Sequence, residues 1–450
     1  MFKRVVLDNF KSFCHLDVDF TGSKDIPHDY VAVFGRNGSG KTNLIQAFQF
    51  LIDSTKTLEH PYPHEDSFKG TIMLEEGFEN CDEETVDLIG KFAKLVGENT
   101  RERLFSLNTS RLVGESKMLG AKGNMRMEFT FVLNGADAVY SMEFGENDRI
   151  VYENLDCRIG NRKGSIFTIS RDENKQISTR YHKSFFVEKE GLPALWDAIS
   201  NDWGPHTLLS ILRRERDSIE SMVCNEVYDA LDHFDDVRIC LRGRKGMTFD
   251  LESGIIRSDK RKMLEAYESA ISKFFIRTSL DIRNVHYDVY EDGGRIHYQL
   301  YFEKRINGEF QDVKSSHESL GTRNLLRLLP YLMELSRGKT VLIDEIDTGI
   351  HVELMYLILE EILGSGNGQL IMTTHNTRLL LKLDPKKAYV INQHYNDAKT
   401  ITPISSIART QKNNNNEDRY HNGVFGDIPH TSLIDMEEIS GTFDEFMGDP

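Results

Sequence analysis

Residues 35–42 read GRNGSGKT and follow directly after the apolar run Tyr30 to Phe34. The octet satisfies the pattern GxxxxGK[ST], in which a glycine-rich loop joins a strand to the N-terminus of a helix. A helical pattern from Asn43 to Leu51 supplies that helix. The octet therefore predicts an α/β fold that binds a nucleoside triphosphate.

The residue types in this loop suit a phosphate chain. Glycines let the backbone wrap closely, so that several N–H groups and the positive N-terminus of the helix converge on the anion. Lys41 reaches the β- and γ-phosphates as a point charge, and the Thr42 hydroxyl reaches Mg²⁺. The candidate ATP-binding residues of the loop are Gly35, Arg36, Asn37, Gly38, Ser39, Gly40, Lys41, Thr42 and Asn43.

A second motif lies near the C-terminal end, where residues 339–345 read KTVLIDE. The apolar run predicts a buried parallel strand that ends in two carboxylates, as in a Walker B motif. Asp344 is the candidate ligand of Mg²⁺, and Glu345 is the candidate residue that polarises the attacking water. The alternative is a strand end with two solvated acids.

Upstream of that strand, residues 318–322 read ESLGT and lead into a segment with apolar residues at helical spacing. The segment resembles an ABC signature, with Ser319 and Gly321 in the Ser-x-Gly positions. In ABC heads this helix N-terminus binds the nucleotide that the opposite subunit holds. The alternative is an ordinary capped helix.

Residues 369–376 read QLIMTTHN, which predicts a short buried strand that ends in a histidine. His375 lies 31 residues after Asp344, where an ABC switch histidine is found. It is a candidate contact for the γ-phosphate or the attacking water, and with Lys41 and Glu345 it makes up the predicted catalytic set. An isolated histidine at a strand end is more often an ordinary polar residue, so the position in the series carries this interpretation.

The N-terminal residues 9–13 read NFKSF and follow an alternating strand pattern. They resemble a segment of RecF- and SMC-type ATPases that lies near the adenine. Lys11 or Phe13 is therefore a candidate contact for the base. The alternative is that Phe10 and Phe13 are core residues.

Charge and cysteine content limit the partners. A formal net charge of −16 makes the whole chain a poor default binder of nucleic acid, so any such binding needs a local basic patch. The five cysteines show no CxxC spacing, which argues against a zinc hook or a disulfide framework. No apolar run approaches the length of about 18 residues that spans a membrane, and we expect a soluble cytoplasmic protein.

The motifs divide the chain of 450 residues into four parts. We expect ATPase lobes at residues 1–155 and 311–412, a mainly helical insertion at 156–310, and an acidic C-terminal segment at 413–450. Two alternating runs flank Asn134-Gly135, which is a strong hairpin signal. An antiparallel sheet beside the nucleotide core follows from this hairpin.

The insertion carries helical patterns at residues 192–234 and 261–276 but no sustained heptad repeat, so we expect a compact insertion without a long coiled-coil arm. Its basic residues are Arg213, Arg214, Arg216, Arg242, Arg244, Lys245, Arg257, Lys260, Arg261 and Lys262. Such runs usually form a solvated helix face. Binding of nucleic acid or of an acidic partner is the alternative.

In combination the motifs resemble one family. To those above we add the run IDEIDTGIH at residues 343–351 and the closing pattern RYHNGVFGDIP at residues 419–429. The set resembles the ABC/SMC-related "AAA family" ATPases of bacterial abortive-infection and other anti-phage systems, relatives of the ATPase half of OLD-family proteins. The resemblance covers residues 1 to about 155 and about 315 to 430, and leaves the insertion uncovered.

The resemblance implies an ABC-type ATPase head, with a mixed P-loop sheet and an antiparallel sheet, that binds ATP and Mg²⁺ between the subunits of a homo-oligomer. Asp347 and His351 would lie in a D-loop that crosses between subunits, although many ABC proteins have Asp where this chain has His351. Glu318 and Thr322 also depart from the Leu and Gln that are common in the signature. Only Ser319 and Gly321 are therefore carried over from that motif.

OLD-family proteins add a C-terminal Toprim nuclease domain, on the order of 100 residues. The segment after about residue 395 is shorter than that, so the resemblance implies an effector on a separate polypeptide. Our leading hypothesis is a slow ATPase that acts as sensor and scaffold for a nuclease or other toxin in anti-phage defence. The alternative is a RecF/SMC-like repair ATPase that clamps duplex DNA on the basic insertion. A self-contained nuclease is a third, less favoured reading.

Overall fold

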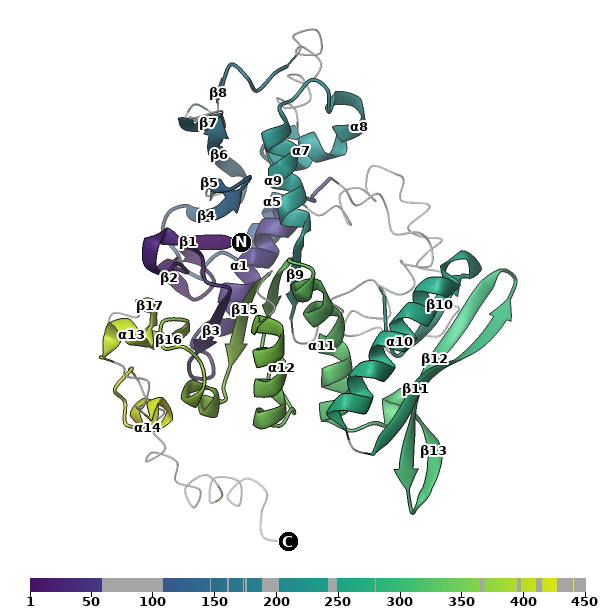
Figure 1. Cartoon of the computed structure of the whole chain (residues 1–450). Coiled ribbons are helices and arrows are strands. Elements are labelled where there is room, and N and C mark those ends of the chain that lie inside the picture. The colour runs from purple at the N-terminus through teal and green to yellow at the C-terminus, as the bar shows by residue number, and fades with distance from the viewer. Residues whose placement is uncertain are drawn as a thin grey trace.

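The computed structural model describes residues 1–58, 108–145, 147–159, 162–172, 174, 176–187, 202–241, 249–279, 281–364, 368–394, 398–409, 415–426 and 440. Within these ranges the chain forms three sheets, with helices packed against them (Figure 1). None of the helices in the same ranges is long and apolar enough to cross a bilayer.

The central sheet has six strands in the order β17-β16-β3-β15-β14-β9. They are β3 (Tyr30–Phe34), β9 (Val237–Cys240), β14 (Thr340–Ile343), β15 (Gln369–Thr374), β16 (Ala388–Gln393) and β17 (Lys399–Pro403). Neighbouring strands are parallel, except that β16 and β17 are antiparallel. The near-continuous apolar sequences of β3, β14 and β15 suit a parallel sheet that is covered on both faces.

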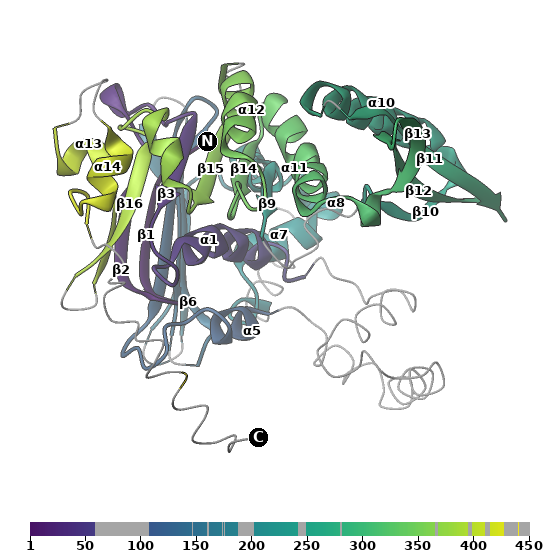
Figure 2. The ribbon, with the colours of Figure 1, turned by 90° about the horizontal axis from the view of Figure 1, so that it is seen from below.

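Helices cover this sheet on both sides (Figure 2). Helix α1 (Lys41–Ser54) packs on one face, and α11 (Leu320–Ser336) and α12 (Val352–Gly364) pack on the other. Successive side chains of β3 point to opposite faces of the sheet. Val31 and Val33 belong to the core shared with α1, whereas Ala32 and Phe34 belong to the core shared with α11 and α12.

A seven-stranded antiparallel sheet packs on the other side of α1, in the order β2-β1-β4-β5-β6-β7-β8. Its strands are β1 (Phe2–Phe10), β2 (Phe13–Asp19), β4 (Met125–Leu133), β5 (Ala136–Phe144), β6 (Ile150–Ile159), β7 (Arg162–Arg171) and β8 (Ile177–Tyr181). The predicted hairpin is confirmed, since Asn134 and Gly135 join β4 to β5 with φ angles of 51° and 73°. The predicted fold class, a P-loop sheet with an added antiparallel sheet, is confirmed as well.

The segment predicted as a mainly helical insertion, 156–310, is mixed. Its helices are α7 (Leu208–Arg214), α8 (Arg216–Ile219), α9 (Asn225–Asp235) and α10 (Arg261–Thr278). It also contains the end of β6, all of β7, β8 and β9, and most of a third sheet. The strands of that sheet are β10 (Ser253–Arg257), β11 (Ile282–Asp292), β12 (Arg295–Ile306) and β13 (Glu309–Lys314), the last of which extends past residue 310. The prediction missed these strands because their short alternating patterns lie beside longer helical ones. Strand β9 even joins the central sheet, so the insertion is not separate from the ATPase lobes.

The third sheet projects from the rest of the molecule with α10 on one of its faces (Figure 1). Strand β12 pairs with β10, β11 and β13. Ile271 and Phe275 of α10 belong to the same buried core as Val285 of β11 and Phe302 of β12. The predicted helix at 261–276 is therefore confirmed as α10, which runs two residues further.

Short helices complete the described chain. They are α5 (Thr109–Gly114), α13 (Ile404–Ile407), α14 (Asn416–His421), and the 3-10 turns η1 (Ser23–Asp25), η2 (Ser258–Lys260), η3 (Ser315–His317) and η4 (Thr377–Leu381). Three predicted basic residues, Arg242, Arg244 and Lys245, lie outside the described residues, as does most of the acidic segment 413–450.

Candidate nucleotide-binding site

The motif residues come together where three central strands end. The P-loop follows β3, Asp344 and Glu345 follow β14, and His375 follows β15. Parallel strands of one sheet end at the same edge, and ligands of open α/β sheets bind at that edge. Three segments that are far apart in the sequence therefore form one site.

Lys41 lies inside the P-loop. Its Nζ donates to the carbonyl oxygens of Gly35 at 2.7 Å and Arg36 at 2.9 Å. Desolvation by burial lowers the pKa of Lys41 to about 8, and the nearby carboxylates of Asp344 and Glu345 oppose this shift. The loop thus holds a cation that is shielded from water and available to an anion.

The glycines of the loop are required by its shape. Gly38 and Gly40 have φ angles of 76° and 117°, in the left-handed region. A Cβ atom at Gly35 would lie 2.8 Å from Ser39 Oγ, and no atom lies within 4 Å of a Cβ built on Gly38. The backbone is therefore tightly wound at Gly35 and open at Gly38, next to the exposed Asn37.

The NFKSF segment, residues 9–13, packs against the last glycine of the P-loop and the start of α1. Asn43 Nδ2 donates to Ser12 Oγ at 2.8 Å, and a Cβ at Gly40 would lie 3.0 Å from the ring of Phe13. Phe10 and Phe13 are fully buried. The core interpretation of these two rings is therefore the one that the structure favours.

Asp344 is held in place by two hydroxyl groups. Thr42 Oγ1 donates to its Oδ2 at 2.9 Å, and Thr373 Oγ1 donates to its Oδ1 at 2.6 Å. The Asp344 side chain is buried next to Thr42, so the two predicted Mg²⁺ ligands are adjacent. Sequence reasoning missed Thr373, although a hydroxyl residue in an apolar strand next to the predicted histidine was a usable signal.

Glu345 and His375 lie near Asp344 and are more exposed to solvent than it is. His375 Nε2 is 3.6 Å from Glu345 Oε1, and its Nδ1 is 3.4 Å from Lys41 Nζ. Burial and the positive charge of Lys41 lower the pKa of His375, so its neutral form is favoured at pH 7. Glu345 has a φ angle of 50°, and strain of this kind in a residue other than glycine concentrates at functional sites.

Ser319 and Gly321 lie apart from this cluster. Ser319 is the N-cap of α11, and in the described chain its Oγ bonds only to Thr322, accepting from the backbone N–H at 3.2 Å. Asn324 Nδ2 donates to the carbonyl oxygen of Thr348 at 2.7 Å, and a Cβ at Gly321 would lie 2.6 Å from the Gly349 carbonyl. The predicted signature thus packs against the D-loop, and not against the P-loop of the same chain.

The residues present fit a bound triphosphate with Mg²⁺. Ser39 Oγ is buried and, within the described chain, lacks a hydrogen-bond partner, as expected for a group in a phosphate cradle. Thr42 and Asp344 offer two oxygen ligands, and Mg²⁺ at phosphates takes one or two protein carboxylates and completes its shell with waters and phosphate oxygens.

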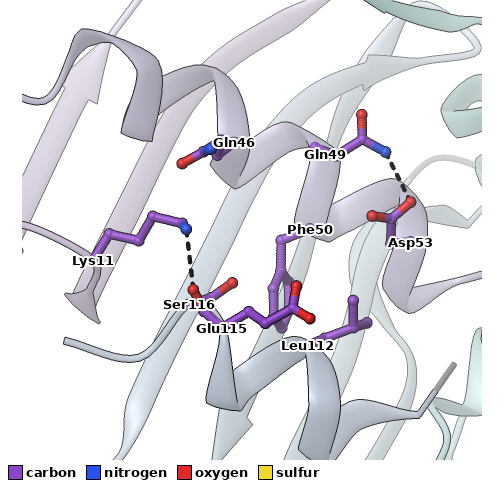
Figure 3. A pocket seen from close by; sticks show the side chains of 8 residues that line it. All are labelled: Lys11, Gln46, Gln49, Phe50, Asp53, Leu112, Glu115 and Ser116. Carbon is purple, nitrogen blue, oxygen red and sulfur yellow. Dashed lines mark hydrogen bonds between the residues drawn. The ribbon is translucent and has the colours of Figure 1, made fainter. Parts of the chain in front are cut away.

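A small polar pocket lies under α1 (Figure 3). Its volume is about 40 Å³, which leaves room for water molecules. Lys11 points into it and donates to the Glu115 carbonyl oxygen at 3.0 Å, while Gln49 donates to Asp53 at 2.8 Å. Lys11 thus links the β1–β2 turn to the end of α5.

Several basic residues of the insertion are paired with acids. Arg213 contacts Asp235, Arg214 contacts Asp202 and Glu215, Arg216 contacts Asp232 and Glu220, Arg257 contacts Asp259, and Arg261 contacts Glu265 and Glu291. Their charges are largely neutralised within the chain. This arrangement fits the solvated-face interpretation better than a phosphate-binding surface.

Comparison with known proteins gives one family. A family model described as "AAA domain, putative AbiEii toxin, Type IV TA system" matches residues 31–381. No curated protein matches the chain.

Solved structures of SMC heads are similar to the chain. The SMC head domain from Thermotoga maritima has 15% identity and a TM-score of 0.37, over 89% of this chain and 98% of that chain. An SMC head bound to the C-winged helix domain of ScpA has 14% identity and a TM-score of 0.46, over 89% and 97%. The Smc head with an extended coiled coil bound to the C-terminal domain of ScpA, derived from Pyrococcus furiosus, has 11% identity and a TM-score of 0.40, over 99% of both chains.

Proposed function

Since the chain belongs to the AAA-domain family whose model matches residues 31–381, we propose that it binds and hydrolyses ATP with Mg²⁺ between two copies of itself. One observation carries the proposal. Lys41, Thr42, Asp344, Glu345 and His375 meet at one edge of the central sheet, while Ser319 and Gly321 lie outside that cluster.

The P-loop side binds and orients the nucleotide. The backbone of residues 35–43 surrounds the phosphates, and the Lys41 ammonium group contacts the β- and γ-phosphates. Thr42 and Asp344 hold Mg²⁺, which neutralises charge on the phosphate oxygens. Thr373 fixes the carboxylate of Asp344 for that task through its 2.6 Å hydrogen bond.

Glu345 and His375 act on the water that attacks the γ-phosphate. The Glu345 carboxylate accepts a hydrogen bond from the water and orients it in line with the phosphate. The lowered pKa of His375 keeps its ring neutral, so that one nitrogen donates while the other accepts. Thr348 Oγ1 donates to the Glu345 carbonyl oxygen at 3.1 Å and lies 3.3 Å from its Oε2, which links this carboxylate to α11 through Asn324.

The second copy completes the site. The N-terminus of α11 carries an exposed Ser319 beside Leu320, whose side chain is 64% exposed. A helix N-terminus binds a phosphate well, and this one packs on Thr348 and Gly349 of its own chain. A head-to-tail pair of chains places it on the γ-phosphate held by the other copy.

At the cellular level we propose that ATP-driven pairing controls a separate toxic effector in anti-phage defence. The description of the matching family, which names a toxin and a TA system, supports this context. The alternative, a clamp on duplex DNA, is disfavoured by the paired arginines of α7 and α8.

Glu345→Gln protein, tagged and purified from its own host with ATP and Mg²⁺, tests this function by native mass spectrometry. Removal of the carboxylate blocks hydrolysis and traps the ATP-bound pair. We expect an even-numbered oligomer with one ATP per chain together with a second protein. A monomer that carries ATP would contradict the shared site, and a dimer with duplex DNA and no second protein would favour the clamp.

A further inference from the structure

The C-terminal pattern at residues 419–426 has no part in the site described above, yet it packs beside it. Helix α14 and the turn that follows lie against η4 and the end of β16. Phe425 is 1% exposed within the core shared with α11 and α12, and Arg419 lies over its ring at 5.1 Å. This segment is therefore docked firmly on the ATPase core.

One contact of the segment reaches the residues that follow His375. Thr377 Oγ1 is 3.0 Å from His421 Nε2 and 3.4 Å from Glu417 Oε1. Thr377 is the first residue of η4, and Asn376 caps this turn through a 3.1 Å hydrogen bond from the Arg378 N–H. The position of His375 is thus tied to α14 through two intervening residues.

A second contact reaches β16, the strand on the other side of β3. Gly426 lies so close to Asn392 that a Cβ at Gly426 would be 1.6 Å from Asn392 Oδ1, and its φ angle of 137° also favours glycine. Ile391, the preceding residue, lies 3.3 Å from the position that a Cβ at Gly35 would take. The same segment therefore supports the first residue of the P-loop from outside.

Tyr420 of the same segment lies within electrostatic range of the P-loop residue Arg36. Burial raises the pKa of Tyr420, and the positive charge of Arg36 opposes this shift. Arg36 itself supplies a carbonyl oxygen to Lys41 Nζ at 2.9 Å.

We propose that residues 415–426 form a positioning element that fixes the P-loop and the His375 segment relative to each other. The inference rests on the proposed ATPase function and assigns the control of its geometry to Thr377 and His421. These residues touch no reacting atom; they act through His375. Loss of the hydrogen bond between Thr377 and His421 lets His375 shift relative to Lys41. This shift weakens contacts made in the transition state more than contacts made with bound ATP.

Steady-state ATP hydrolysis by the full chain tests the proposal. Thr377→Val and His421→Ala each remove the same hydrogen bond, so each should lower kcat about fivefold, with KM for ATP changed less than about twofold. The double variant should be no worse than either single variant, because both act on one contact. Thr377→Ser keeps the hydroxyl and should restore kcat.

Thr400→Val is the matched control, because it breaks a similar histidine–threonine contact, His394 Nε2 to Thr400 Oγ1 at 3.1 Å, on the β16–β17 hairpin. It should leave kcat unchanged. Equal kcat values for Thr377→Val, His421→Ala and Thr400→Val would overturn the positioning role, as would a Thr377→Ser variant as slow as Thr377→Val. A Lys41→Ala chain that binds ATP normally would instead overturn the nucleotide site on which the inference rests.

Discussion

The P-loop and the signature helix differ in how much of their surroundings this chain supplies. Around the P-loop, Lys41 is 5% exposed and Asp344 is 2% exposed, and their partners come from the ends of three strands. At the signature, Ser319 is exposed and bonds within its own turn, and the neighbouring Leu320 is 64% exposed.

In the proposed shared site, the difference shows which half is finished within one chain. The P-loop half has its charges placed and their partners fixed before any second chain is present. The signature half packs on Thr348 and Gly349 and pairs through Glu318 with Lys304, while Ser319 at its helix N-terminus is exposed. Variants on the two sides should therefore fail in different ways.

Lys41→Ala should have the largest effect and break the P-loop half alone. Loss of charged hydrogen bonds to the phosphates should weaken ATP binding about 100-fold, measured by calorimetry on the monomer. Lys387→Ala is the control, since Lys387 pairs with Asp29 at the opposite edge of the same sheet. Unchanged ATP affinity in Lys41→Ala would show that the buried cation is structural only.

Ser319→Arg should break the signature half alone. We expect ATP affinity of the monomer to be unchanged, and hydrolysis to fall about 100-fold because the added bulk moves the helix N-terminus off the γ-phosphate of the other copy. Ser319→Asn keeps a capping side chain and controls for helix stability.

Mixing the two inactive variants sharpens the comparison. Equal amounts of Lys41→Ala and Ser319→Arg chains form pairs in which one shared site is intact, so about a quarter of the wild-type rate should return. An inactive mixture would argue that each chain completes its own site.

Thr373→Val tests whether the P-loop half depends on its supporting hydroxyl. The Asp344 carboxylate loses a 2.6 Å hydrogen bond, so hydrolysis at limiting Mg²⁺ should fall about tenfold. Thr373→Ser keeps the donor and should stay near the wild-type rate. If excess Mg²⁺ does not restore the hydrolysis rate of Thr373→Val, the substitution acts on something other than the Asp344 carboxylate.

The pH dependence of ATP binding should be the smallest effect. Lys41 has a pKa of about 8, and the phosphates bind its protonated form, so affinity should fall as pH rises through 8. Between pH 7 and 8.5 the apparent Kd should rise about fourfold, because the protonated fraction falls by that factor. Lys41→Arg stays charged over this range and should show a flat profile, which calorimetry at each pH would check.

Much of the site could be read from the order of its motifs. The P-loop, the two carboxylates and His375 are short local patterns at strand ends, and the parallel sheet brings such ends together. Thr373 and His421 could not be assigned in the same way. Their importance comes from contacts with Asp344 and Thr377, which are distant in sequence, and no local periodicity encodes such contacts.

In the insertion, local sequence patterns predicted much less of the structure. Helical spacing correctly predicted α10, but β11 and β12 have patterns of period two that are stable only when α10 covers their apolar face. The sequence left open that the basic residues of α7 and α8 bind a nucleic acid. In the fold, acidic side chains pair with these residues.

By itself the sequence determined the α/β class, the P-loop and the residues that follow each strand of the nucleotide edge, because these depend on local glycine, apolar and acidic patterns. Only the tertiary structure decided that the signature packs against Thr348 and Gly349 and that residues 415–426 pack on Thr377 and Asn392. Those relations depend on how distant strands and helices pack, and burial and charge at each residue are set by that packing.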